Sequence, residues 1–362
     1  MLFIRFNKFW TLYETIVFMK SKRINMKKYI TIFCFLIFSF SFAENELKLG
    51  YIGDLVLESG EIIENCQVGY RFIGNANQDS SNIVLMPTWF GGLSEHIINF
   101  VKKYNFISQN EFLIIAVDAL GNGNSSSPSN YPEAMPEFSI KDMVKSQYLL
   151  LTKNLKIKHL YGIVGGSMGS FQTFQWVVSY PDFIDRAIPY VCSPIRTSSD
   201  KMWLNLEKEI ITLHKKNGIA EGETQKIMEI LTTYFAQTQK HMSREIDTNE
   251  FDKYYKKFVP NVSRPFSIDN RLSQINAMLQ HDITKQFGSS MEISMEETIK
   301  HIKAEMLIIV SDSDQIVNPE PAMRFAELSG SKLIVMSNEC GHLAPGCDIE
   351  TFSGYIDEFL KK

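Results

Sequence analysis

The 362-residue sequence lacks the patterns that mark metal-binding, nucleotide-binding and repeat proteins. No pair of cysteines or histidines has the spacing of metal ligands, and no glycine-rich nucleotide loop follows the first expected strand. Tandem repeats and low-complexity segments are also missing. We therefore expect an ordinary globular protein that needs neither a metal nor a cofactor.

A basic excess is missing as well. The chain has 37 lysines and arginines against 41 aspartates and glutamates, which gives a formal net charge of −4. Residues 1–43 hold seven of the basic residues and one of the acidic ones, so the remainder carries −10. Because nucleic-acid binding depends on clustered lysine and arginine, this balance argues against a nucleic-acid partner.

The longest apolar run lies near the N-terminus. Residues 26–43 read MKKYITIFCFLIFSFSFA, with a methionine, two lysines, an apolar run, and the small residues Ser41 and Ala43. This is the layout of a secretory signal peptide, and the run is short for a membrane span, which needs about 20 residues. We expect Met26 to be the true start, with cleavage after Ala43 and export to the periplasm or beyond the cell. The mature chain would then have no membrane span. An uncleaved N-terminal anchor is the alternative.

Short apolar segments of strand length recur along the rest of the chain. The last six of the eight are almost wholly apolar, as expected for strands buried on both faces of a parallel sheet. Helical patterns separate most of them, which indicates an α/β fold with an eight-stranded, mostly parallel sheet. The eight segments are residues 47–57, 63–74, 82–88, 112–118, 159–165, 186–192, 306–310 and 332–336.

The connection between the sixth and seventh segments is much longer than the others. It carries amphipathic helical patterns at residues 200–218, 223–242 and 267–283, and a connection of that length with its own helices is an inserted subdomain. We therefore expect a lid over the ends of the strands, which is also a candidate surface for a homodimer. The expected parts are an extension (1–43), a core (44–195 and 304–362) and a helical lid (196–303).

A serine flanked by glycines stands between the fifth expected strand and a helical pattern. The stretch VGGSMGSFQ, residues 164–172, contains the only Gly-x-Ser-x-Gly match in the chain, centred on Ser167. A sharp strand-to-helix turn would expose the serine oxygen, and Gly165 and Gly169 would avoid collisions that a Cβ atom would cause. A solvated glycine turn is the alternative, but the flanking strand and helix favour Ser167 as a nucleophile.

A serine nucleophile needs a base, and the base needs a carboxylate to orient it. After the seventh strand the chain reads VSDSDQIVNP, with Asp312 and Asp314, and after the eighth SNECGHLAPGCD, with His342. Open α/β sheets place their sites at these carboxyl ends of strands, and the order Ser, Asp, His is that of nucleophile-elbow folds. We expect a triad of Ser167, Asp314 and His342, with Asp312 capping the turn.

Two backbone amides should stabilise the negative charge that develops during acyl transfer. One belongs to Met168, which follows the nucleophile, and the other to the loop after the third strand, MPTWFGGLSEH. We expect Trp89 to supply the second amide, with Phe90 as the alternative. His96 and His281 lie inside helical patterns, so we interpret them as packing or cap residues.

Four cysteines follow residue 43: Cys66, Cys192, Cys340 and Cys347. The last two bracket His342 and could close a small loop in an oxidising compartment. We expect a Cys340–Cys347 disulfide. Two free buried thiols, or a bond between Cys340 and Cys192, are the alternatives.

With these residues placed, the chain resembles the homoserine O-acetyltransferase family over most of its length after residue 43. The resemblance rests on residues 55–77, which contain LESG, on residues 139–182 around Ser167, and on residues 275–283, INAMLQHDI. It implies the α/β-hydrolase fold, with the helical lid inserted after the sixth strand. It also implies a ping-pong mechanism in which Ser167 takes an acyl group and passes it to an acceptor hydroxyl.

Two positions depart from the family where the substrate would bind. In the family an aspartate follows the catalytic histidine and helps to bind the amino group of homoserine, whereas this chain has Leu343. The family's lid arginine grips the substrate carboxylate, and the nearest cation here is Lys208, a weaker match for a planar carboxylate. We expect Phe90, Lys208 and Leu343 to lie at the substrate site.

These observations predict an exported serine acyl-transfer enzyme. Its partners would be a small-molecule ester or acyl donor and, as acceptor, either water or a hydroxyl compound. One alternative is a genuine homoserine O-acetyltransferase that uses acetyl-CoA, which requires residues 26–43 to be retained. The other is a non-catalytic exported binding protein of the same fold, and the ordered Ser, Asp and His argue against it.

Overall fold

One eight-stranded sheet forms the centre of the protein, and each apolar segment expected from the sequence coincides with one strand. The structure is a computed structural model that describes residues 45–258, 266–287 and 294–361. The signal peptide expected at residues 26–43 lies outside the described residues. Within them, no helix is both long enough and apolar enough to cross a membrane. The strands are β1 (Lys48–Val56), β2 (Ile62–Ile73), β3 (Ile83–Pro87), β4 (Leu113–Val117), β5 (Leu160–Gly166), β6 (Ile184–Tyr190), β7 (Glu305–Ser311) and β8 (Lys332–Met336).

The strand order is β1-β2-β4-β3-β5-β6-β7-β8. Strand β1 pairs antiparallel with β2, and β2 pairs antiparallel with β4. All the other neighbouring strands are parallel, which confirms the expected α/β-hydrolase sheet. The carboxyl ends of β3 and β5 to β8 therefore meet at one edge of the sheet.

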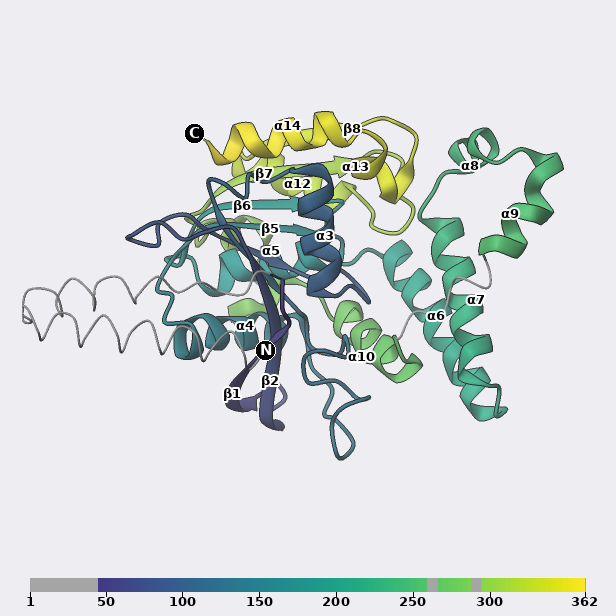
Figure 1. The fold of residues 1–362 in the computed structure, drawn as a ribbon, viewed down its shortest axis with the longest axis horizontal. Helices are drawn as coiled ribbons and strands as arrows, with labels where there is room; N and C mark the ends of the chain where they lie inside the picture. Colours follow the sequence, from purple (N-terminus) through teal and green to yellow (C-terminus); the bar gives the residue numbers. More distant parts are fainter. Residues whose placement is uncertain (1–44, 259–265, 288–293, 362) are drawn as a thin grey trace, which may run out of the picture. The chain divides into compact units, whose positions relative to one another are not determined.

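The middle of the sheet is buried on both faces: β3 and β4 are buried at every position, and β5 and β7 at all positions but one. In β7, Ile308 and Val310 pack into one core cluster, whereas Leu307 and Ile309 pack into the other, as the two-residue period of a strand requires. Helices cover both faces of the sheet (Figure 1). Helices α4 (Ile140–Leu149), α5 (Met168–Ser179) and α12 (Glu320–Ser329) contribute to the first cluster, and α3 (Ser94–Tyr104) and α14 (Ile349–Leu360) to the second.

The described parts of the segment between β6 and β7 are mainly helical, and we call residues 196–303 the lid. The pattern expected as one helix at residues 223–242 is two helices, because Thr238 begins a new one by accepting a hydrogen bond from the amide of His241. In Figure 1, α6 to α9 group together, with α10 on the side nearer the sheet. The lid helices are α6 (Ser198–Lys216), α7 (Glu221–Phe235), α8 (Gln239–Glu245), α9 (Phe251–Phe258), α10 (Ile268–Leu279) and α11 (Met295–Ile299).

Candidate active site

Ser167 makes the turn between β5 and α5 by itself, since the strand ends at Gly166 and the helix begins at Met168. Its φ of 54° and ψ of −125° are values that residues with a Cβ atom rarely adopt. The amide of Ser167 donates to the carbonyl oxygen of Tyr190 at 3.1 Å, which ties the turn to the end of β6. The neighbouring strand therefore helps to hold the strained serine in place.

The two glycines expected to allow this turn are required by close backbone approaches. A Cβ atom on Gly165 would lie 2.3 Å from the carbonyl oxygen of Gly169. A Cβ atom on Gly169 would lie 2.7 Å from the carbonyl oxygen of Pro87 at the end of β3. Both distances are shorter than any real contact of a Cβ atom, so α5 can start this close to β5 and β3 only with glycine at both positions.

His342 lies between Ser167 and Asp314 in one chain of hydrogen bonds. Its Nε2 is 3.0 Å from Ser167 Oγ, and its Nδ1 is 2.7 Å from Asp314 Oδ2. The Asp314 side chain is 1% exposed and that of His342 13%. Asp312 takes no part in this chain, because its Oδ2 accepts a hydrogen bond from Ser337 Oγ at 2.6 Å. The structure thus brings together the three residues expected to form a triad.

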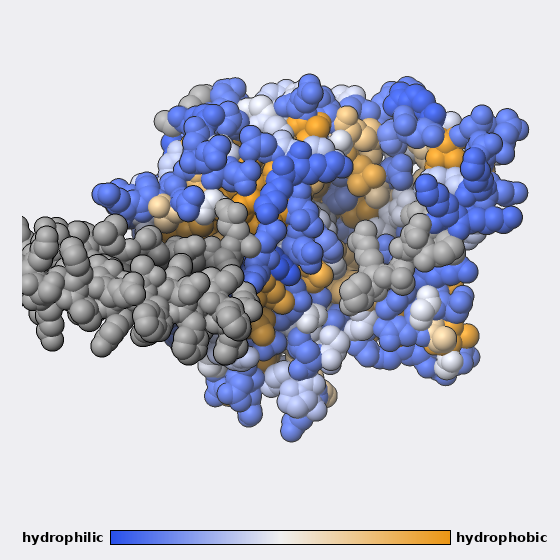
Figure 2. Space-filling view, in the orientation of Figure 1, coloured by the Kyte–Doolittle hydropathy of each residue, from blue (hydrophilic) through white to orange (hydrophobic). Residues whose placement is uncertain are grey.

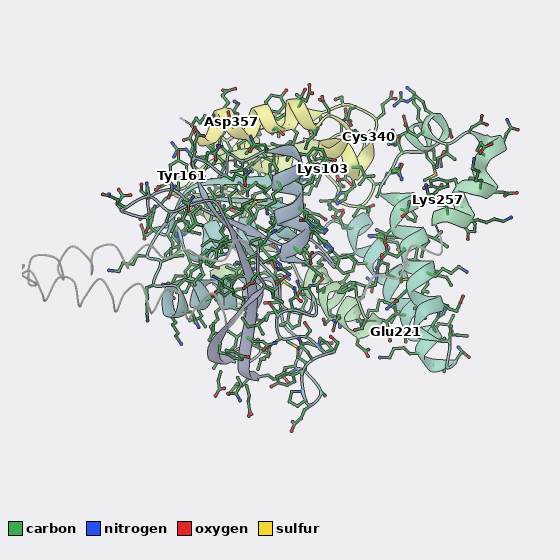
Figure 3. The ribbon with its side chains drawn as sticks, viewed as in Figure 1. Lys103, Tyr161, Glu221, Lys257, Cys340 and Asp357 are labelled. Carbon is green, nitrogen blue, oxygen red and sulfur yellow. A yellow bond between two sulfur atoms is a disulfide. The ribbon has the colours of Figure 1, made fainter. Side chains whose placement is uncertain are left out.

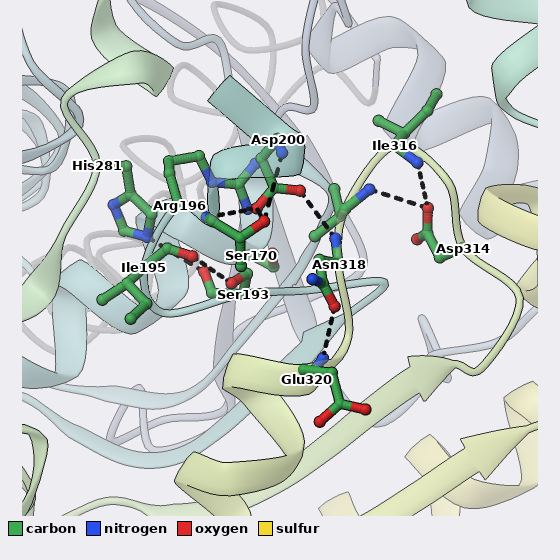
Figure 4. A network of polar contacts seen from close by, with 12 residues as sticks. Ser170, Ser193, Ile195, Arg196, Asp200, His281, Asp314, Ile316, Asn318 and Glu320 are labelled. Atoms are coloured by element: carbon green, nitrogen blue, oxygen red, sulfur yellow. Dashed lines mark hydrogen bonds and ion pairs between the residues drawn. The ribbon is translucent and has the colours of Figure 1, made fainter. Parts of the chain in front are cut away.

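The loop after β7 fixes the Asp314 carboxylate from its other side. Asp314 Oδ1 accepts hydrogen bonds from the amides of Ile316 and Val317 at 2.9 and 3.0 Å. The amide of Asn318 donates to Asp200 Oδ1 at 2.9 Å (Figure 4). Because Asp200 belongs to the first turn of α6, this bond connects the base of the lid to the loop that carries Asp314.

Glutamine side chains anchor the loop after β3 to two helices. Gln172 Nε2, from α5, donates to the carbonyl oxygen of Thr88 at 2.9 Å. Gln274, from α10 of the lid, accepts from the amide of Gly91 at 3.0 Å and donates to the carbonyl oxygen of Leu120 at 3.0 Å. Both glutamines are fully buried, so these hydrogen bonds do not compete with water.

The expected oxyanion residues, Met168 and Trp89, both occur beside Ser167. Met168 is the first residue of α5, and the first amides of a helix have no partner within it. Trp89 lies between the anchored residues Thr88 and Gly91 and lines the same cavity as Ser167. The amides of Met168 and Trp89 therefore remain our candidates for the oxyanion hole.

A largely apolar cavity of about 570 Å³ opens at Ser167 and His342. In Figure 2, apolar atoms border a hollow between the sheet and the lid helices. The expected substrate residues Phe90 and Leu343 line the cavity, and they differ in setting because Leu343 is 43% exposed, whereas Phe90 packs against the core. The lining consists of Trp89, Phe90, Phe100, Gly166, Ser167, Tyr190, Val191, Trp203, Glu207, Thr232, Ala236, Ile316, His342, Leu343, Pro345, Gly346 and Cys347.

The structure does not bring Lys208 to this cavity. Its Nζ donates to Asn276 Oδ1 on α10 at 2.9 Å. The preceding residue, Glu207, lines the cavity instead. Successive residues of a helix point about 100° apart, so Glu207 faces the cavity while Lys208 faces away from it. The expectation that Lys208 lies at the substrate site was therefore wrong by one residue of α6.

An arginine of α10 pairs with Glu207, and sequence reasoning did not find it. Arg271 Nε and Nη2 donate to the two oxygens of Glu207, each at 2.9 Å. Nη2 also donates to Thr232 Oγ1 at 2.8 Å, and Nη1 to Glu229 Oε1 at 3.4 Å. The Glu207 side chain is 1% exposed and that of Arg271 6%. The sequence separation of 64 residues left no local signal of this pairing.

A disulfide joins Cys340 to Cys347, with their Cα atoms 6.5 Å apart. Figure 3 labels Cys340 in the segment that faces the lid. Cys340 Sγ lies 3.4 Å from Nδ1 of His241, a residue of α8. In the described part of the chain, these two cysteines and His241 are the one group whose side chains could together hold a metal, and here both sulfurs are used in the disulfide. Cys192 is free and buried.

His281 is a buried packing residue, as the sequence indicated. Its ring stacks on Phe171 with 4.9 Å between centroids, and Nε2 lies 3.2 Å from the carbonyl oxygen of Ser193 (Figure 4). Burial, together with the nearby Arg196, lowers the pKa of His281 to about 3. The imidazole is therefore neutral at physiological pH.

Comparison with known proteins agrees with this architecture. A family model described as alpha/beta hydrolase fold matches residues 82–345. An ethyl acetate hydrolase of Pseudomonas veronii is 27% identical over 283 residues, which cover 73% of this chain and 79% of that protein. A homoserine O-acetyltransferase of Nautilia profundicola is 25% identical over 371 residues, covering 85% of this chain and 96% of that protein. The solved structure of the acetyl esterase MekB superimposes with a TM-score of 0.78 at 24% identity, over 88% of this chain and 98% of that one.

Proposed function

The chain belongs to the alpha/beta hydrolase fold family as an enzyme of acyl transfer or ester hydrolysis, and we propose that it hydrolyses short-chain esters through an acyl-enzyme at Ser167. The observation that carries this proposal is the hydrogen-bonded chain Ser167–His342–Asp314 at the wall of an apolar cavity. An apolar cavity of this size suits a small neutral ester. The relatives named for ethyl acetate and acetyl groups point to a short acyl chain.

The residues have the following roles in this reaction. His342 Nε2 takes the proton of Ser167 as Oγ bonds to the ester carbonyl carbon. The amides of Met168 and Trp89 donate to the oxyanion, and Asp314 stabilises the imidazolium. His342 then gives its proton to the departing alcohol oxygen as the ester C–O bond breaks. A water molecule attacks the acyl-enzyme in the same manner, releasing the carboxylic acid and restoring Ser167.

Acyl transfer to another alcohol is the second candidate, because a homoserine O-acetyltransferase is among the relatives. Homoserine itself is a poor fit for this cavity. Leu343 stands where that family has an amino-binding aspartate, and Lys208 hydrogen-bonds to Asn276 away from the cavity. The acceptor we favour is therefore water or an uncharged alcohol.

We further propose that the enzyme is exported after cleavage behind Ala43. The signal-like composition of residues 26–43 supports this, and a disulfide between Cys340 and Cys347 suits an oxidising compartment. N-terminal sequencing of the protein recovered from the medium or periplasm would test the site of cleavage. A protein that keeps residues 26–43 would contradict it.

Turnover of 4-nitrophenyl acetate, with and without added alcohols, tests the proposed reaction. We expect nitrophenol release in water alone, with acetate as the second product. If product forms only when a particular alcohol is present, the enzyme is a transferase. If neither water nor any alcohol supports turnover, the proposal is wrong.

A further inference from the structure

We propose that Glu207 determines substrate charge in the active site: by occupying the fork of Arg271, it makes the enzyme reject esters that carry a carboxylate. This inference rests on the proposed function and specifies the class of ester, namely neutral ones. The two residues come from different lid helices, Glu207 from α6 and Arg271 from α10.

The contacts of Arg271 explain why it cannot itself bind a substrate. A guanidinium has five N–H hydrogens, and four of them are used by Glu207, Thr232 and Glu229. The Nε–Nη2 edge, which fits a carboxylate with two parallel hydrogen bonds, is taken by Glu207. The ring of Phe90 lies against the guanidinium, with 4.9 Å between its centroid and Cζ.

The acidic member of this ion pair, rather than the arginine, lies at the cavity wall, although its side chain is only 1% exposed. Glu207 lines the cavity and Arg271 does not; the uncharged residues Thr232, Trp203 and Phe90 line it as well. Repulsion between like charges is weakly screened where water is excluded. A neutral ester escapes this repulsion, whereas an ester with a carboxylate would be held off or would have to displace Glu207.

Removing the Glu207 side chain should reverse this preference. In Glu207→Ala, the edge of Arg271 would be free and the space of the lost carboxylate empty, so a substrate carboxylate could take the same two hydrogen bonds. Glu207→Gln keeps the size of the side chain and removes only its charge, and it guards against a failure of the alanine variant to fold. Glu229→Gln is the matched control, because Glu229 contacts Arg271 but does not line the cavity.

The experiment compares matched esters that differ only in charge. One pair is 4-acetoxybenzoate and its methyl ester, with the charge on the alcohol part. The other is 4-nitrophenyl hydrogen glutarate and its methyl ester, with the charge on the acyl part. For at least one pair, we expect the wild-type enzyme to prefer the neutral ester by about tenfold or more in kcat/KM, since one close like charge has an effect of this order. Glu207→Ala should lower that ratio at least about tenfold, mainly through the KM of the anionic ester.

Binding separates this inference from the proposed function. The same four compounds would be titrated calorimetrically into Ser167→Ala and into Ser167→Ala combined with Glu207→Ala, where no turnover is needed. Tighter binding of an anionic ester only in the double variant supports the role of Glu207 even if the wild-type enzyme hydrolyses no ester. The inference would be overturned if the wild type had equal kcat/KM values for charged and neutral esters. It would also be overturned if Glu207→Ala and Glu207→Gln left the ratio of these kcat/KM values unchanged. A change in Glu229→Gln as large as that in Glu207→Ala would overturn it as well.

Discussion

Asp314 Oδ2 lies 2.7 Å from His342 Nδ1, while the other carboxylate oxygen of Asp314 accepts two backbone amides. The carboxylate is thereby held with one oxygen facing the imidazole. This arrangement leaves Nε2 of His342 unprotonated and facing Ser167 Oγ.

Asp314→Asn should lower the rate of ester hydrolysis by about 10⁴-fold, because an amide at this position permits the wrong imidazole tautomer. Asp312→Asn is the matched control, two residues away, and should change the rate by less than about tenfold, since the Asp312 side chain hydrogen-bonds to Ser337 and not to His342. Steady-state hydrolysis of 4-nitrophenyl acetate measures both. A larger loss in Asp312→Asn would contradict the assignment.

Ser167→Ala should lose about 10³-fold or more in kcat and keep its melting temperature, because the three residues act as one unit in catalysis. A fluorophosphonate probe should label the wild-type protein at Ser167 and leave the variant unlabelled. Peptide mapping that finds the label on a different serine would show that the nucleophile lies elsewhere.

Gln274→Leu should reduce kcat by about tenfold with a smaller change in KM, because Gly91 and Leu120 lose their hydrogen bonds to a buried amide and the oxyanion loop loosens. Gln280→Leu serves as the control, since Gln280 caps the C-terminal end of the same helix and is exposed. If the two changes lowered kcat equally, Gln274 would have no specific role in holding the oxyanion loop in place.

Opening the Cys340–Cys347 disulfide should lower kcat, because the closed loop carries His342. The loss of stability should be modest, at most roughly 3 kcal/mol for so short a loop. A mild dithiol reductant should slow the wild-type enzyme but have no effect on Cys347→Ser, which lacks the bond already. Alkylation of both cysteines in the untreated protein would show that the disulfide is absent in solution.

His281 should make the protein less stable in mild acid. Its pKa is about 3 in the folded state and near 6.5 when unfolded, so between these values the unfolded chain binds one more proton. The contribution of neutral His281 to the free energy of unfolding is complete above about pH 6.5. It is lost as the pH falls below that value, at up to about 1.4 kcal/mol per pH unit. Melting curves at about pH 7.5 and about pH 5 should show a smaller drop for His281→Gln than for the wild type. An equal drop in both proteins would contradict this.

The strands and the order of Ser167, Asp314 and His342 could be predicted because each depends on local sequence. A buried parallel strand is recognisable from its own apolar run, and the nucleophile turn from Gly165 and Gly169. Asp314 could be chosen over Asp312 from the local turn, but the expected cap was wrong: Asp314 itself caps the turn, and Asp312 accepts from Ser337. Each of these predictions needs only a few neighbouring residues.

The polar residues of the lid could not be predicted in this way. Whether Glu207 or Lys208 meets the cavity depends on the rotation of α6 about its axis, which is set by packing against α10. The partner of Glu207 is Arg271, 64 residues away. The break before α8 was missed because the apolar pattern continues across it, although Thr238 is a helix-capping residue.

Gln274 belongs to the lid by sequence but to the core by its hydrogen bonds with Gly91 and Leu120. For protein engineering, this places the useful boundary for exchanging lids before α10 rather than after it. A chimaera that imports foreign helices in place of α6 to α9 would retain the support of the oxyanion loop. Its imported helices would still have to bring an acidic partner for Arg271, and replacing that partner by design offers a route to enzymes with new charge selectivity.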